Sequence, residues 1–191
     1  MYQILKEIKI GEQSYPIRAE GDYRMVLDCF SILNDVELTK EERIIGSLLI
    51  FYEIDIDNLL NDNNIQQLAI KMFEFFNCAQ VDTTTRVYPK LMDWDADSQL
   101  ICAAVNKVAG VEVRSVEYMH WWTFMGYYVS IGESLYATIL QIRDKMLKGK
   151  TLERHEKEFR AQNPQYFVWN SKTPDQAEMD DLLKSVWNSG K

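Results

Sequence analysis

Apolar residues recur at helical spacing through the middle of the chain, where three helices are predicted in succession. The first covers about 95–109 and ends at Gly110, because glycine readily adopts the left-handed conformation that closes a helix. The second covers about 116–130, with Ser115 as its N-cap. The third covers about 133–148. Its apolar positions are three or four residues apart and are Leu135, Ile139, Ile142 and Met146.

In the N-terminal part of the chain, the spacing of apolar residues changes from that of strands to that of helices. Apolar and polar residues alternate over 2–18 on both sides of Gly11, which predicts a β-hairpin. The period then becomes helical and predicts helices over about 22–34, 43–53 and 65–76. Thr39 and Glu42 have the spacing of a capping box, in which each side chain satisfies the backbone N–H of the other residue, and they mark the start of the second of these helices.

The C-terminal part carries two further predicted helices. Thr151 can cap a short charged helix over about 152–161, after which residues 162–173 show no period. Thr173 and Pro174 form a typical helix start. The apolar face of the helix that follows consists of Met179, Leu182, Leu183, Val186 and Trp187. This helix either packs back on its own domain or docks on a partner as a helix in a groove.

Together these patterns predict a mainly α-helical fold. Residues 1–161 would form one domain of about six to eight helices with a short N-terminal β-hairpin, and residues 162–191 would form a linker and a C-terminal amphipathic helix. A chain of 191 residues, 47% of them apolar, can bury a sizeable core.

Charge and cysteine content indicate which binding partners and which cellular compartment are expected. Twenty-one basic residues against 29 acidic residues give a net charge of −8, which opposes binding to nucleic acid or anionic lipid and favours protein partners. Three well-separated cysteines fit a reducing compartment better than export. The N-terminus has no signal-peptide core, and no run approaches the ~18 apolar residues of a membrane span. We therefore expect the protein to stay in the cytoplasm where it is made.

None of the possible metal-binding or catalytic motifs in the sequence is complete. Asp93, Asp95 and Asp97 resemble the opening of a calcium loop, but Ser98 and Ala104 stand where that loop requires glycine and glutamate. The two histidines have no metal ligand at suitable spacing. The sequence contains no phosphate-binding loop. We therefore predict no catalytic, cofactor-binding or metal-binding residue and no enzymatic activity.

The most unusual stretch is aromatic and lies within the second central helix, at residues 118–128. One face carries Tyr118, Trp121, Trp122, Met125, Tyr128 and Val129, and the opposite face carries His120, Phe124, Tyr127 and Ile131. A helix that is apolar all round must be covered on both sides, by its own domain or by another subunit or client. The predicted partner-binding residues are His120, Phe124, Tyr127, Ile131, Leu182, Leu183, Val186 and Trp187.

The same stretch carries a family resemblance. The pattern D-W-D-x-D at 93–97, the pattern Y-M-H-W-W-x-F at 118–124 and the pair Ile142-Arg143 resemble the bacteriophage gene-product-fifteen family of tailed phages and prophages of Gram-positive bacteria. Asp22-Tyr23-Arg24 and L-L-I-F-Y at 48–52 agree with it, and the resemblance covers about 1–160.

The resemblance implies a tail assembly chaperone in the host bacterial cytoplasm. Members of the family tend to be encoded beside the tape-measure protein, so the implied partners are that protein and the tail-tube protein, with a homo-oligomer possible and with neither nucleic acid nor membrane. It carries over no catalytic residue. Two alternatives stay open: a structural tail or neck component, which would be retained in purified particles, and a small regulatory or nucleic-acid-binding protein. The last would need a basic patch, yet the best basic run, 143–157, is interrupted by acidic residues.

Overall fold

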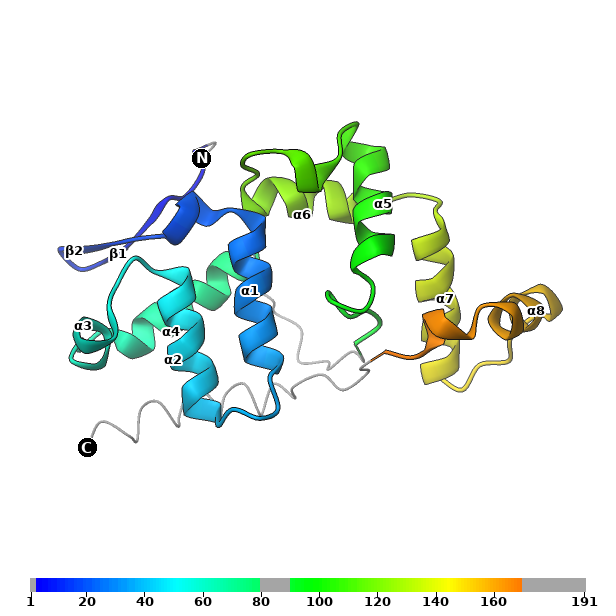
Figure 1. The fold of residues 1–191 in the computed structure, drawn as a ribbon, viewed down its shortest axis with the longest axis horizontal. Coiled ribbons are helices and arrows are strands. Elements are labelled where there is room, and N and C mark those ends of the chain that lie inside the picture. The colour runs from blue at the N-terminus through cyan, green and yellow to red at the C-terminus, as the bar shows by residue number, and fades with distance from the viewer. Residues whose placement is uncertain (1–2, 80–89, 170–191) are drawn as a thin grey trace. The chain divides into compact units, whose positions relative to one another are not determined.

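The computed structural model describes residues 3–79 and 90–169. These residues form eight α-helices, three short 3-10 helices and one two-stranded sheet (Figure 1). The predicted mainly α-helical fold with an N-terminal hairpin is confirmed. The described residues form two compact units: a first unit of 3–79 and 118–125, and a second unit of 90–117 and 126–169. The division into a domain over 1–161 and a linker with a final helix stays a prediction, because residues 170–191 lie outside the described part.

The hairpin consists of antiparallel strands β1 (Glu7–Ile10) and β2 (Gln13–Pro16). Gly11 has a φ of +60°, the positive value that a two-residue hairpin turn needs. Ile8 and Tyr15 face each other across the strands, and both are buried. Because side chains alternate along a strand, this register sends one apolar row into the first unit and leaves the polar row exposed.

Helices α1 (Tyr23–Asn34), α2 (Lys40–Phe51) and α4 (Ile65–Phe76) complete the first unit, with α2 packed against both of the others. The capping box of Thr39 and Glu42 is present, and α2 starts at Lys40, three residues before the predicted start. The buried side chains recur at helical spacing and include Val26, Cys29, Ile44, Leu48, Phe51, Leu68, Met72 and Phe75. Helix α3 (Ile56–Leu60) was not predicted, because five residues are too few to show a period.

The second unit contains α5 (Ser98–Ala109), α7 (Leu135–Leu147) and α8 (Arg154–Gln162). Helix α5 packs on α7, and the 3-10 helix η3 (Pro164–Phe167) contacts both α7 and α8. Gly110 ends α5 with a φ of +71°, as predicted. The predicted cap Thr151 is wrong: α8 starts after Glu153, whose backbone N–H donates to Glu156, and the other carboxylate oxygen of Glu156 accepts from Lys145.

Helix α6 (Trp121–Val129) begins five residues later than predicted, and Ser115 does not cap it. Ser115 belongs instead to the 3-10 helix η2 (Val113–Ser115). The residues before α6 are held by the first unit: the N–H of Met119 donates to the Asp22 carboxylate at 2.9 Å, and the N–H of Tyr23 donates to the carbonyl of Met119 at 2.9 Å. These long-range bonds fix an extended segment that the local period could not reveal.

Candidate interaction surface

The aromatic segment 118–125 contributes four buried side chains to the core of the first unit, those of Met119, His120, Trp121 and Phe124. Trp121 is 1% exposed, and its indole N–H donates to the carbonyl of Phe76 at 2.9 Å. Phe124, also 1% exposed, stacks on Tyr23 with ring centroids 4.4 Å apart. Buried aromatic pairs add stabilisation beyond the area they remove from water. The segment is therefore a structural centre that joins α1 to α4.

His120 is buried beside this centre and bonded on both ring nitrogens. Its Nδ1 accepts from the backbone N–H of Trp122 at 3.1 Å, and its Nε2 lies 3.3 Å from the carbonyl of Leu5. This pattern fits a neutral ring that carries its proton on Nε2. Burial lowers the pKa of His120, while the Leu5 carbonyl and the Asp22 carboxylate act in the opposite direction. His120 therefore packs as a neutral core side chain.

The structure separates the eight predicted partner-binding residues. His120 and Phe124 are buried in the first unit, whereas Tyr127 and Ile131 are half-buried in the second. The remaining four, Leu182, Leu183, Val186 and Trp187, lie outside the described residues. A partner-binding role for the set stays a prediction. Among the described members, Tyr127 and Ile131 are the accessible ones.

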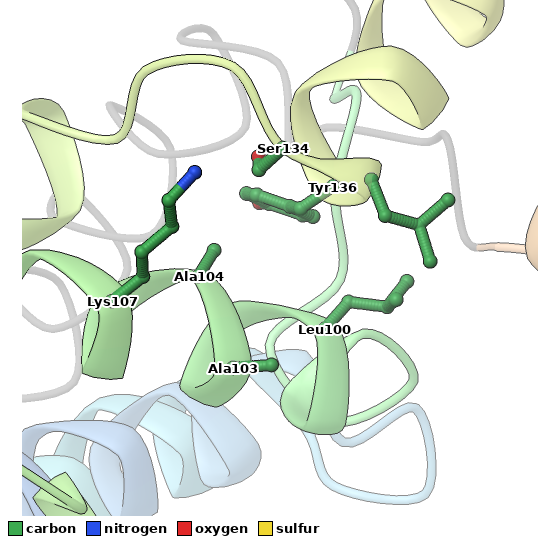
Figure 2. A pocket seen from close by; sticks show the side chains of 7 residues that line it. Leu100, Ala103, Ala104, Lys107, Ser134 and Tyr136 are labelled. Carbon is green, nitrogen blue, oxygen red and sulfur yellow. The ribbon is translucent and has the colours of Figure 1, made fainter.

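Ile131 lines an open groove between α5 and the chain that leads into α7. A hollow of about 270 Å³ is walled by Leu100, Ala103, Ala104, Lys107 and residues 134–136. Figure 2 shows the side chains from α5 on one side and those from the start of α7 on the other, facing one another across this hollow. A neighbouring hollow of about 170 Å³ shares Ala104, Lys107 and Ser134 and extends to Ile131. The two hollows thus form one groove, which we call the α5–α7 groove.

The α5–α7 groove is open and mostly apolar. Ala103 and Ala104 lower its floor because their side chains are short, while Leu135, 48% exposed, forms part of its wall. Lys107 donates to the carbonyl of Glu133 at 3.1 Å and places one cation at the rim. Concave, mostly apolar sites with a few placed polar groups are typical of binding sites. The titratable side chains in its lining are Lys107, Glu133 and Tyr136.

The centre of the second unit is a buried ion pair. Arg143 binds Asp97 through two bonds of 2.6 and 2.9 Å, and the two side chains are 1% and 3% exposed. A planar guanidinium that grips both carboxylate oxygens gives a strong and directional contact. Arg143 also donates to the carbonyl of Leu91 at 3.0 Å, so that α7 is tied to the start of α5 and to the chain before it.

A C-terminal strap, residues 164–169, closes over the same arginine. The Nε of Arg143 donates to the carbonyl of Tyr166 at 2.9 Å. The ring of Trp169 lies 4.5 Å from the guanidinium carbon, and its indole N–H donates to the carbonyl of Lys90 at 2.9 Å. A cation over an indole face is the strongest aromatic partner for arginine. The chain therefore leaves the described region at Trp169, a residue held firmly in the second unit.

The side chains that might have carried chemistry are used structurally. Asp93 accepts the backbone N–H groups of Asp95 and Ala96, each at 3.0 Å, and Asp97 is paired with Arg143. In the described part of the chain, no group of three His, Cys, Asp or Glu residues is placed to hold a metal. Burial raises the pKa of the thiols of Cys29, Cys78 and Cys102, which opposes thiolate formation. No described helix is both long and apolar enough to cross a bilayer.

Comparison with known proteins places the chain in a family. The family model described as "Bacteriophage Gp15 protein" matches residues 2–167, which include every described element. The chain belongs to this bacteriophage family. No curated protein and no solved structure matches it. Family membership supports a phage structural protein of the head–tail connector type and offers nothing that points to catalysis.

The residues that carry the family resemblance are the two structural centres. Trp121 and Phe124 belong to the aromatic core of the first unit, and Asp97 and Arg143 form the ion pair of the second. Sequence reasoning missed this pairing, although one signal was available. Arg143 follows Ile139 and Ile142 on the apolar side of a predicted helix, and a buried cation there requires an acidic partner elsewhere. The α5–α7 groove was also missed, because adjacent alanines give no local sign of a hollow.

Proposed function

We propose that the protein is a phage tail assembly chaperone that binds the tape-measure protein and assists tail-tube assembly without catalysis. The family match over residues 2–167 carries the proposal, because the resemblance implies an encoded position beside the tape-measure protein. The acidic chain, with a net charge of −8, also favours a protein client over nucleic acid.

Shielding is the mechanism that the surface supports best. Long tape-measure helices expose apolar stripes until the tube surrounds them, and such stripes aggregate unless they are covered. The α5–α7 groove would receive apolar side chains from one helical face, and Ile131 and Leu135 would contact them. The open form of the groove would let the client leave when tube subunits arrive.

A structural component of the virion is the second candidate, since the family match supports a phage structural protein of the head–tail connector type. The fate of the protein separates the two functions. A chaperone leaves the particle after assembly, whereas a connector or neck component stays. Mass spectrometry of purified particles therefore distinguishes them. Stoichiometric recovery of this chain from mature particles would overturn the chaperone proposal.

The direct test is coexpression with the tape-measure protein encoded in the same phage or prophage. We expect the chain to raise the soluble fraction of the client and to copurify with it. Leu135→Asp, on the wall of the groove, should weaken copurification. Val36→Asp is the matched control, because Val36 is an exposed apolar residue of the first unit, 83% exposed, and is not among the residues that line the groove. Equal client recovery with both variants would exclude the groove as the client site.

A further inference from the structure

We propose that strand β1 pairs edge to edge with β1 of a second copy of this chain, so that the two hairpins form one continuous antiparallel sheet. The pairing is centred on Ile8 and sets Glu7 of each copy opposite Lys9 of the other copy. This contact goes beyond the proposed function and does not depend on it, because it requires neither a client nor a virion.

The hydrogen bonds of the hairpin show which backbone groups lie on the outer edge of β1. The N–H of Ile17 donates to the carbonyl of Lys6 at 2.8 Å, so these two residues form a hydrogen-bonded pair next to the start of the ladder. Hydrogen-bonded and non-hydrogen-bonded pairs alternate along antiparallel strands. Glu7 and Lys9 therefore direct their backbone N–H and C=O groups away from β2.

The opposite strand agrees with this assignment. Pro16 is the partner of Glu7, and a proline in a strand must have its nitrogen on the side that forms no ladder bond. Its carbonyl accepts from the N–H of Glu53 at 3.0 Å, so the outer edge of β2 is already bonded within the chain. In residues 3–79 and 90–169, in contrast, no backbone group bonds to the outward groups of Glu7 and Lys9. Such an edge is a template for another strand.

Charge selects both the partner and the register. With the two-fold axis at Ile8, the outward groups of Glu7 meet those of Lys9 from the other copy, and each carboxylate lies opposite an ammonium group. A shift of the partner strand along the edge would instead set Glu7 opposite Glu7 or Lys9 opposite Lys9. Like charges directly opposite one another destabilise a sheet. The strand is thus complementary to itself, which is what a two-fold interface requires.

The ends of the edge also fit this pairing. The carbonyl of Leu5, which lies before the free edge, is occupied because Nε2 of His120 is 3.3 Å away. The residue opposite Leu5 would be Gly11 of the second copy, whose φ of +60° turns that chain back into its own hairpin. The partner strand therefore ends where the free edge ends. The side chains of Glu7 and Lys9 are 48% and 69% exposed and can be reached by the other copy.

Self-association of the full-length protein, without any client, tests the proposal. Sedimentation equilibrium should show monomers and dimers in exchange, with weak affinity because the shared edge is short. Hydrogen exchange should locate the contact. The amides of Glu7 and Lys9 should exchange more slowly as the protein concentration rises. The amide of Ile8 points to β2 and should be equally protected at every concentration.

A single charge reversal should break the dimer. Lys9→Glu should weaken dimerisation by at least about tenfold, because each Glu7 then faces a like charge. Lys71→Glu is the matched control, since it changes the net charge equally at another exposed lysine that pairs with a glutamate of its own element. Dimerisation should be unchanged in this control.

Two rescue experiments test the register. Glu7→Lys and Lys9→Glu should each fail to dimerise alone, yet their mixture should form a heterodimer, because glutamates on one strand then face lysines on the other. Both variant chains remain acidic overall, so their net charges repel and cannot explain the association. A chain that carries both substitutions should dimerise with itself again, because the complementary pairs are restored in reverse.

Three outcomes would overturn the proposal. One is a monomer at every accessible concentration of the unaltered protein. Another is dimerisation that Lys9→Glu leaves undiminished, which would place the contact on a different surface. The third is a mixture of the two single variants that stays monomeric, which would exclude the pairing centred on Ile8. Failure of the chaperone function changes none of these readouts, because no client is present.

Discussion

Each of the two units is stabilised internally by a different kind of interaction. The first unit is centred on packed aromatic rings: Phe124 stacks on Tyr23 of α1, and Trp121 donates a hydrogen bond to Phe76 of α4. The second unit is centred on a charge: Arg143 is buried and satisfied by Asp97 and by backbone carbonyls from two further segments. The stability that apolar packing provides falls gradually as side chains are shortened. A buried charge that loses its partner, in contrast, is left without compensation by a single substitution. The units should therefore differ in how they respond to single changes.

The largest effect is expected at the buried ion pair. Arg143→Met leaves Asp97 buried without its partner and frees two carbonyls, which should lower the free energy of unfolding by about 3–5 kcal/mol. Urea unfolding followed by tryptophan fluorescence measures it. Arg154→Met is the control, because that arginine is 93% exposed and its pair with Glu158 should contribute less than about 1 kcal/mol. Similar losses for both variants would contradict a charge-centred second unit.

The aromatic centre should be nearly as sensitive. Phe124→Ala removes a ring stacked on Tyr23 and should lower the free energy of unfolding by about 3 kcal/mol. Tyr127→Ala, at a half-buried position on the same helix, should cost no more than about 1 kcal/mol. Thermal unfolding of the two variants gives the comparison. If Tyr127→Ala proves the more damaging, the assignment of Phe124 to the core and of Tyr127 to the surface is wrong.

Between pH 6.5 and 5, a pH dependence of stability is expected from the first unit. Burial depresses the pKa of His120 below its ordinary value of 6.5, so the unfolded chain takes up a proton first as the pH falls. Stability is therefore full above about pH 6.5 and declines below it. His120→Gln should flatten the slope of stability between pH 6.5 and 5. His155→Gln is the control, because His155 is largely exposed, and it should keep the slope.

The smallest effect on stability is expected at the groove. Leu135 is about half exposed at the first position of α7, where an aspartate interacts favourably with the helix dipole. Leu135→Asp should change the free energy of unfolding by less than about 0.5 kcal/mol. Differential scanning calorimetry checks this figure. A large loss would mean that Leu135 belongs to the core, and binding experiments with this variant would then need another wall residue.

The sequence predicted what neighbours along the chain determine. The hairpin around Gly11, the capping box of Thr39 and the end of α5 at Gly110 all depend on local conformation, and all are present. The start of α6 was missed because residues 97 positions apart decide it, through the bond between Met119 and Asp22.

The site shows the same limit. Ile131 was predicted on periodicity and does line the groove, yet His120 and Phe124, which were predicted on the same helical face, are buried. The first part of α6, up to Met125, belongs to the first unit, and the rest, from Gly126, belongs to the second. Periodicity reports that a face is apolar, and it does not report which neighbour covers it. The ion pair joins residues 46 positions apart and was equally invisible.

The order of synthesis gives the bond between Trp121 and Phe76 a further consequence. The two residues are 45 positions apart, and most of the residues between them belong to the beginning of the second unit. At 5–20 residues per second, a ribosome needs roughly 2–9 s to supply Trp121 after Phe76 has been made. During that interval the aromatic ends of α4 lack the side chains that complete their core. The first unit must therefore finish folding after part of the second has been translated, and a nascent chain cut after residue 85 lacks the means to complete it.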